Sequence, residues 1–261
     1  MKLLRHTLAT LAVVATSICA ADPLPTVQIQ FDNPIFMESG SDNVNIYFTR
    51  PGATLVTREY VAAGRFQGTG SNVVGVPTSI FVDGLNDLYM YCYDIYQDIN
   101  HGSNVKYNIN LEGELDRTRD FLGAVNQELN ANNKHFNRPY DPYAWLHPVS
   151  GNQGAAIQLG IWESRYETNT AWDLATGAFR ADALETETQN AWLSFVGALG
   201  SSESIDKPFI MTLESSTHQD MITADPPPAN VPEPGSLALL GTALALLAVA
   251  QGRSSRRAAR A

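Results

Sequence analysis

The segment "AAIQLGIWE", residues 155–163, places one polar side chain on an apolar helical face. At helical spacing, Gln158 shares this face with Ala155, Ile161 and Trp162. Burying a side-chain amide without a hydrogen-bond partner costs roughly 2–7 kcal/mol. Gln158 is therefore expected to be hydrogen-bonded, to border a pocket, or to have reacted with another group.

A second reactive residue type lies in the segment "YMYCYD", residues 89–94. Cys92 alternates in phase with Leu88 and Met90, which puts its thiol on the apolar face of a predicted strand. A buried free cysteine is a common core residue. The other cysteine, Cys19, lies in a predicted leader peptide, so Cys92 has no partner for an intramolecular disulfide. A lone thiol in an exported protein calls for an explanation.

The two segments together resemble the motif pair of bacterial thioester domains, which are known from Gram-positive surface adhesins. In that family, a strand cysteine that follows an aromatic residue bonds to a glutamine that precedes an Ile-Trp pair in a helix. The resemblance implies a thioester between Cys92 and Gln158, and it extends to "DLATGAF", residues 173–179. Gly160 departs from the pattern, since the family usually has alanine there. The resemblance implies a surface adhesin, and we expect no enzymatic turnover and no cofactor.

The chemistry of such a bond explains why cysteine and glutamine are needed together. A cysteine thiolate attacks the side-chain carbonyl of glutamine and expels ammonia, which leaves an activated acyl group inside the protein. A tyrosine hydroxyl or His147 is a candidate for the assisting base, and nothing in the sequence selects one. The expected partner is an amine on a surface or matrix molecule. The alternative is an unreacted Gln158, hydrogen-bonded to backbone where a sheet meets a helix.

A strand and a helix must position these two residues, and the chain predicts both. Between residues 26 and 96, four segments with two-residue alternation or β-branched and aromatic residues predict an antiparallel sheet or sandwich. From Leu115 the apolar spacing becomes helical, and further helices are expected around Gln158 and from Arg180 to Leu199. Residues 207–215 are predicted to form a returning strand. The predicted fold class is α+β: an antiparallel β-sheet or sandwich with a helical layer that carries the glutamine.

Processed or unfolded segments are expected on both sides of this domain. Residues 1–21 have a basic start, an apolar run from Leu8 to Val14 and small residues at a cleavage position, which is the pattern of a secretory signal peptide. The folded domain is expected at residues 24–216. A Pro-rich linker is expected at residues 217–231, because that segment has too little apolar content to fold.

The final segment, residues 232–261, combines three features in a fixed order: a Pro-Glu-Pro turn, an apolar stretch and a basic end. The turn is Pro232, Glu233 and Pro234, and the basic residues are Arg253, Arg256, Arg257 and Arg260. This order resembles the PEP-CTERM sorting signal of Gram-negative bacteria that make exopolysaccharide. The resemblance implies export, transient anchoring in the inner membrane with the arginines in the cytoplasm, and cleavage by an exosortase-type sorting enzyme. The cell surface or the extracellular space is the expected destination.

Charge restricts the partners of the mature protein. Residues 22–234 hold 11 lysines and arginines against 27 aspartates and glutamates, a net charge of −16. Nucleic acid and anionic membrane surfaces are poor partners for so acidic a domain. The histidines lack metal-ligand spacing, so no metal site is predicted. Besides a covalent adhesin, the sequence is compatible with a non-covalent structural or carbohydrate-binding protein of an exopolysaccharide matrix. Its tryptophans offer a platform for stacking on sugars, but tryptophans in a helical layer are more often core residues.

Overall fold

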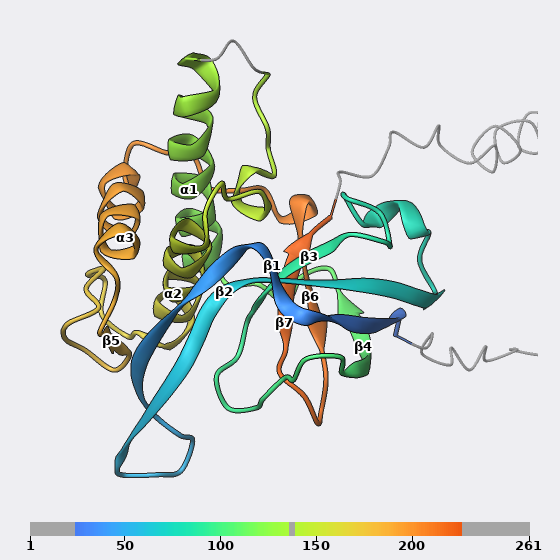
Figure 1. The fold of residues 1–261 in the computed structure, drawn as a ribbon, viewed down its shortest axis with the longest axis horizontal. Helices are drawn as coiled ribbons and strands as arrows, with labels where there is room; N and C mark the ends of the chain where they lie inside the picture. The colour runs from blue at the N-terminus through green and yellow to red at the C-terminus, as the bar shows by residue number, and fades with distance from the viewer. Residues whose placement is uncertain (1–23, 136–138, 226–261) are drawn as a thin grey trace, which may run out of the picture.

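A computed structural model describes residues 24–135 and 139–225, and it has a mixed α+β fold (Figure 1). The strands are β1 (Thr26–Thr49), β2 (Val56–Val74), β3 (Leu88–Cys92), β4 (Asn104–Asn110), β5 (Arg180–Asp182), β6 (Ile210–Glu214) and β7 (Met221–Ala224). The helices are α1 (Asp116–His135), α2 (Gly151–Tyr166) and α3 (Thr186–Ala198), with short 3-10 turns η1 (Thr78–Ile80), η2 (Ala144–Leu146) and η3 (Lys207–Phe209). The expected signal peptide and sorting tail lie outside these described residues.

The strands form one seven-stranded sheet in the order β2-β3-β7-β6-β4-β1-β5, and β2 also pairs with β1. This additional pairing closes β1, β2, β3, β7, β6 and β4 into a ring, while β5 extends the far half of β1. Every pairing in the described part of the chain is antiparallel. The antiparallel sheet expected from the sequence is therefore confirmed.

A long hairpin of β1 and β2 leaves the ring as an arm (Figure 1). The two strands predicted within residues 26–48 are one continuous strand, β1, whose register with β2 shifts between Phe31 and Ser41. Beyond the shift, β1 pairs with β2 up to Thr49 and Val56, next to the turn at the tip. Gly52 in that turn has φ of 77°, a conformation that glycine adopts without a steric penalty.

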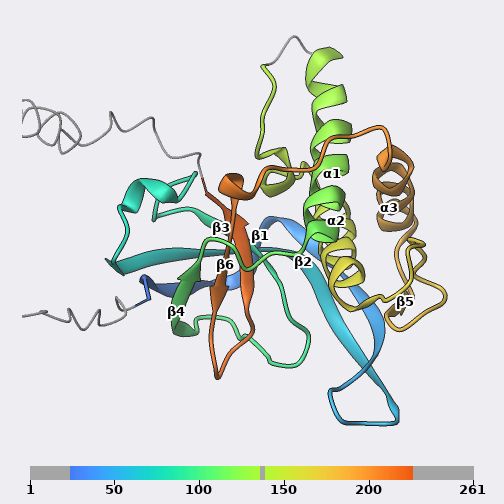
Figure 2. The same cartoon turned by 180° about the vertical axis from the view of Figure 1, so that it is seen from behind.

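Helix α2 is the central element of the helical layer, and it contacts β1, β2, β3, α1 and α3. Twelve of its 16 residues are buried, as expected for a helix that is apolar on all sides. Ser150 caps its N-terminus by accepting a hydrogen bond from the backbone N–H of Gln153 at 3.2 Å. Seen from behind, the three helices lie together on one side of the sheet (Figure 2). The sheet and the helical layer thus meet along α2.

Three strands were not expected from the sequence: β4, β5 and β7. β7 lies within the segment expected to be a linker, yet all four of its residues are buried, because it is inserted between β3 and β6. The folded part of the chain therefore continues beyond Ser216, to at least Ala224. Helix α3 begins at Thr186, since the preceding residues Arg180–Asp182 pair with β1.

Candidate functional site

Cys92 and Gln158 lie against each other where β3 meets α2. The Oε1 atom of Gln158 accepts a hydrogen bond from the backbone N–H of Cys92 at 2.8 Å. Its Nε2 atom donates to the backbone carbonyl of Cys92 at 2.7 Å. Both residues are buried, with exposed fractions of 1% for Cys92 and 0% for Gln158. The structure thus brings together the two residues that the sequence singled out, with the amide hydrogen-bonded at the sheet–helix junction.

Cys92 is the last residue of β3, and the chain turns sharply after it. Asp94 makes this turn by accepting hydrogen bonds from the backbone N–H groups of Tyr96 and Gln97 at 3.0 and 3.3 Å. Its other carboxylate oxygen accepts from the backbone N–H of Asp220 at 2.6 Å. On the strand side, the Tyr91 hydroxyl donates to the backbone carbonyl of Trp145 at 3.0 Å. The position of Cys92 is therefore held from both sides.

The thiol of Cys92 is in its neutral form. Burial raises its pKa well above the ordinary value, and the negative charges of Asp94 and Asp98 raise it further. A buried uncharged thiol is a poor nucleophile until its proton is removed. Any reaction at this sulfur must therefore include a proton transfer.

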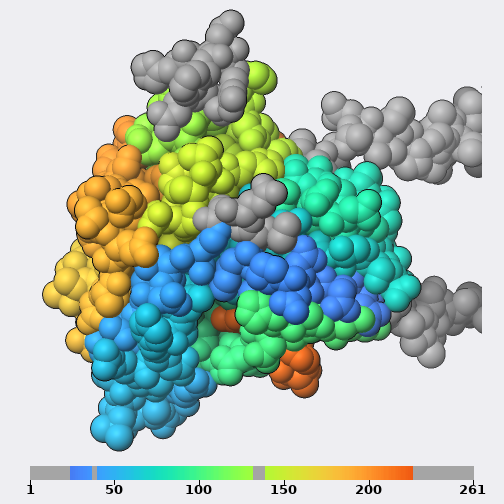
Figure 3. Space-filling model, in the orientation of Figure 1, coloured from blue at the N-terminus to red at the C-terminus, as the bar shows by residue number. Residues whose placement is uncertain are grey.

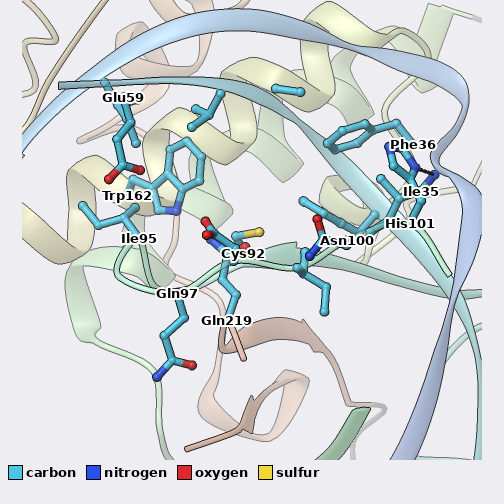
Figure 4. Close-up of a pocket in the computed structure, with 16 residues that line it drawn as sticks. Ile35, Phe36, Glu59, Cys92, Ile95, Gln97, Asn100, His101, Trp162 and Gln219 are labelled. Atoms are coloured by element: carbon cyan, nitrogen blue, oxygen red, sulfur yellow. Dashed lines mark hydrogen bonds between the residues drawn. The ribbon is translucent and has the colours of Figure 1, made fainter. Parts of the chain in front are cut away.

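A cleft of about 260 Å³ extends from Cys92 to the surface. It lies between the β1–β2 arm and the segment that follows β3, and Figure 3 shows a hollow there, with orange residues of the C-terminal part visible inside it. Figure 4 places the sulfur of Cys92 in the middle of the lining residues, with Trp162 and Glu59 on one side and Asn100 and His101 on the other. A small group entering the cleft can therefore approach Cys92.

The candidate bases expected from the sequence are hydrogen-bonded to other groups. His147 has its Nε2 atom 3.0 Å from Asp83 and its Nδ1 atom 3.0 Å from Asp141. The hydrogen bond to Asp83 is the main reason why the pKa of His147 is raised. The Tyr91 hydroxyl is already committed to a carbonyl, and the Tyr107 hydroxyl donates to the backbone carbonyl of Gln219 at 3.1 Å. His147 does not line the cleft.

His101 is a histidine that does line the cleft, and sequence reasoning did not select it for this role. Its Nδ1 atom accepts a hydrogen bond from the backbone N–H of Ile35 at 3.0 Å (Figure 4). In the neutral ring the proton is consequently on Nε2, which acts as a donor. Glu59 and Asp98 were also not predicted as cleft residues. The sequence feature that could have predicted Asp98 and His101 as cleft residues is their closeness to Cys92 along the chain.

Two carboxylates near the C-terminal end of α2 have opposite properties. Burial raises the pKa of Glu163 to about 7, and the nearest cation, Arg117, is 3.8 Å away. Burial also opposes ionisation of Glu167, but four backbone N–H donors outweigh it and lower the pKa of this group. These donors belong to the segment between Thr168 and Phe179, so Glu167 shapes the loop that follows α2.

The tryptophans are mostly core residues. Trp145, Trp162 and Trp192 are buried, and Trp172 is stacked on Phe121 with the guanidinium of Arg117 at 4.2 Å from its ring centroid.

In the part of the chain that the structure describes, no group of three His, Cys, Asp or Glu side chains is placed to hold a metal ion. Within the same residues, no helix has the length and apolar character needed to span a membrane.

Comparison with known proteins identifies the C-terminal segment. Residues 230–257 match the family described as the PEP-CTERM protein-sorting motif. No curated protein and no solved structure matches the chain. The motif marks an exported protein that is anchored transiently through its C-terminal tail and processed by an exosortase. These comparisons do not support the resemblance of the central domain to thioester domains, which stays a prediction from the sequence.

Proposed function

We propose that the exported domain attaches covalently to an amine of a surface or matrix molecule through a thioester between Cys92 and Gln158. One observation carries this proposal: the carboxamide of Gln158 is held by both polar backbone groups of Cys92, and Cys92 lines an open cleft. The two residues that would react are then in direct contact before any reaction. Such positioning replaces an encounter in solution by an intramolecular step.

The two hydrogen bonds of Gln158 suit the first step of this chemistry. When sulfur attacks the side-chain carbonyl carbon, negative charge develops on Oε1, and the backbone N–H of Cys92 is already directed at that atom. A C–S bond forms, the C–N bond breaks, and the thiol proton passes to the nitrogen that leaves as ammonia. Because burial keeps the thiol protonated, attack and proton transfer must be closely coupled.

The second step consumes the stored acyl group. An uncharged amine of the partner attacks the thioester carbonyl, a C–N bond forms, and the C–S bond breaks. One proton of the amine goes to the sulfur, so the Cys92 thiol is restored and Gln158 becomes a secondary amide linked to the partner. The product is stable, so each molecule reacts once and the protein has no turnover. No cofactor takes part in either step.

The decisive experiment is the mass of the purified exported domain. An intact thioester lowers the mass by about 17 Da, the mass of the ammonia that is expelled. Cys92→Ala must remove the deficit, and methylamine must add to the wild type alone while restoring a thiol that a maleimide labels. A full mass together with a thiol that titrates in the unfolded, untreated protein would overturn the covalent proposal.

A second candidate is a non-covalent structural or carbohydrate-binding protein of an exopolysaccharide matrix. The two hydrogen bonds of Gln158 are compatible with it, because they satisfy the buried amide without any reaction, but the cleft beside Cys92 is then unexplained. Its tryptophans support it less, since three of them are buried and Trp172 is stacked on Phe121. Retention of the unmodified domain on an exopolysaccharide column, undiminished in Cys92→Ala, would support this alternative.

A further inference from the structure

One edge of the β1–β2 arm has no partner strand. β2 pairs with β1 from Val56 to Val74, whereas β3 covers its other edge only from Phe66 to Gly68. For residues 56–64, the described part of the chain provides no strand and no further backbone hydrogen bond on that side. In an antiparallel ladder, alternate residues direct their N–H and C=O groups away from the partner. This segment therefore presents free donors and acceptors.

Three large apolar side chains are exposed along this edge, and the charged residues Arg58 and Glu59 lie between them. Val56 and Tyr60 are 54% and 70% exposed, and Leu55 next to them is 80% exposed. Proteins normally protect such edges with charged residues, proline or a covering segment. An exposed edge with apolar side chains suits the addition of an extended peptide, whose backbone pairs with the edge.

The same edge borders the cleft that leads to Cys92. Glu59, Val61 and Ala62 of β2 line this cleft together with Cys92. In Figure 3 the arm forms one wall of the hollow. A strand lying along residues 57–62 would pass the opening of the cleft, and alternate side chains of that strand would point towards it.

The acidic residues of the cleft favour a positively charged side chain on a strand that docks here. Glu59 and Asp98 supply carboxylates, while none of the described lining residues is a lysine or arginine. Glu59 forms an ion pair with Arg50 at 2.8 Å. Asp98 has no cationic residue beside it among the lining residues. A long side chain that ends in an amine is complementary to this lining.

We propose that the free edge of β2 at residues 57–62 docks an extended peptide segment of a partner protein and directs a lysine of that segment into the cleft. This inference rests on the proposed thioester for its covalent outcome, but the docking itself is independent of the bond. Recognition by backbone pairing accepts many sequences, and the acidic cleft adds the requirement for lysine.

The test compares amines that differ only in their backbone. The probes are a peptide of about seven residues with β-branched residues around a central lysine, and N-acetyl-lysine N-methylamide as the matched small amine. Two further peptides carry N-methyl groups on alternate backbone nitrogens, one set on each edge of the strand. The rate of adduct formation is measured by mass on the wild-type domain.

The peptide is expected to react at least about tenfold faster than the small amine. One N-methylated peptide must lose this advantage and the other must keep it, because one edge of the strand faces β2. Glu59→Gln and Asp98→Asn should each slow adduct formation with both amines, because both carry the lysine side chain, whereas Glu112→Gln, an exposed carboxylate in another turn, should not. Equal rates for peptide and small amine, or for both N-methylated peptides, would overturn the docking proposal.

A second measurement distinguishes failure of the thioester proposal from failure of the docking proposal. If the domain shows no mass deficit, docking is measured in Cys92→Ala by hydrogen exchange, with the lysine peptide as probe. Protection of backbone amides within residues 57–62 then supports the edge as a peptide site without covalent chemistry. Absence of protection overturns it, as does a stable dimer in which a second copy of the chain occupies the same edge.

Discussion

The ring of Phe121 in α1 lies directly over Gly160 in α2, and a Cβ atom at Gly160 would overlap three ring carbons. Position 160 is therefore glycine because an aromatic ring from the neighbouring helix fills the space of a side chain. Thioester domains usually have alanine there. Gly160 lies two residues from Gln158, and the glycine leaves α2 intact as a helix.

Gly160→Ala is expected to lower the free energy of unfolding by about 1–3 kcal/mol, because Phe121 must leave its position. The matched change is Gly197→Ala in α3, where an added Cβ meets no atom within 4 Å. That substitution should stabilise by roughly 0.5–1 kcal/mol through helix propensity. Urea unfolding measures both, and equal effects of the two changes would contradict the packing described here.

Gln158→Leu tests the hydrogen bonds apart from the chemistry when it is made in a Cys92→Ala background. Leucine fills a similar volume but leaves the buried backbone N–H and C=O at position 92 without partners. The expected cost is about 2–4 kcal/mol relative to Cys92→Ala alone. Gln189→Leu, on the exposed face of α3, serves as control and should change stability by less than about 0.5 kcal/mol.

Glu163 should make the domain less stable as pH rises. Its pKa is about 7 in the folded state against the ordinary 4.5, so the folded domain retains a proton that the unfolded chain releases. The contribution of Glu163 to the free energy of unfolding is fully present below pH 4.5 and is lost as the pH rises from 4.5 to 7. Glu163→Gln should therefore gain about 1–3 kcal/mol at pH 8 and flatten this part of the stability profile.

Glu167, the residue that caps the C-terminus of the same helix, provides the opposite control. Its pKa is lowered in the folded state, so its contribution is present above pH 4.5 and is lost as pH falls through the folded value. Glu167→Gln removes a charged acceptor of four backbone N–H groups and should cost about 2 kcal/mol or more at pH 8. If both glutamine variants shifted stability in the same direction, the assignment of these two environments would be wrong.

Trp162→Ala should affect both stability and the lifetime of the proposed thioester. Trp162 is 3% exposed and lines the cleft beside Cys92, so its loss opens a cavity and admits water. The expected cost is roughly 3–5 kcal/mol, and the mass deficit should disappear by hydrolysis faster than in the wild type. Leu193→Ala, at a position that is 58% exposed, should change neither property appreciably.

Processing at the C-terminus can be tested in cells that produce the exosortase. Replacing Pro232 and Glu233 by alanine should leave the protein in the membrane fraction, because the sorting motif spans residues 230–257. Alanine at Pro226 and Pro227, outside the motif, should allow normal release from the membrane. Protein recovered from the medium with its arginine tail intact would contradict this pathway.

Local patterns predicted the elements that hold the site but not the cleft beside it. The sequence predicted a helix around Gln158 and a strand ending at Cys92, and the expected apolar surroundings of Gln158 are confirmed by the burial of Ile161 and Trp162, although α2 is buried on all sides rather than on one face. The short segment Met221–Ala224 has no periodicity of its own to reveal it. It is a strand because β3 and β6, distant in sequence, supply its hydrogen bonds.

The surroundings of the thiol also depend on contacts between distant segments. His147 was a reasonable candidate base from its place just before α2, but Asp83 and Asp141 bind both of its ring nitrogens. Spacing along the chain does not reveal such pairings. Asp98 and His101 reach the cleft because the chain turns at Asp94, and the β1–β2 arm forms the opposite wall.

The contact between β3 and α2 joins two residues that are 66 positions apart in the chain. A covalent cross-link across such a loop restricts the unfolded ensemble, an entropic effect of about 4 kcal/mol. In the proposed reaction, an amine takes the acyl group to the partner and cuts this cross-link in the same event. On that proposal, the domain that has bound its partner unfolds more easily than the domain that still holds its thioester.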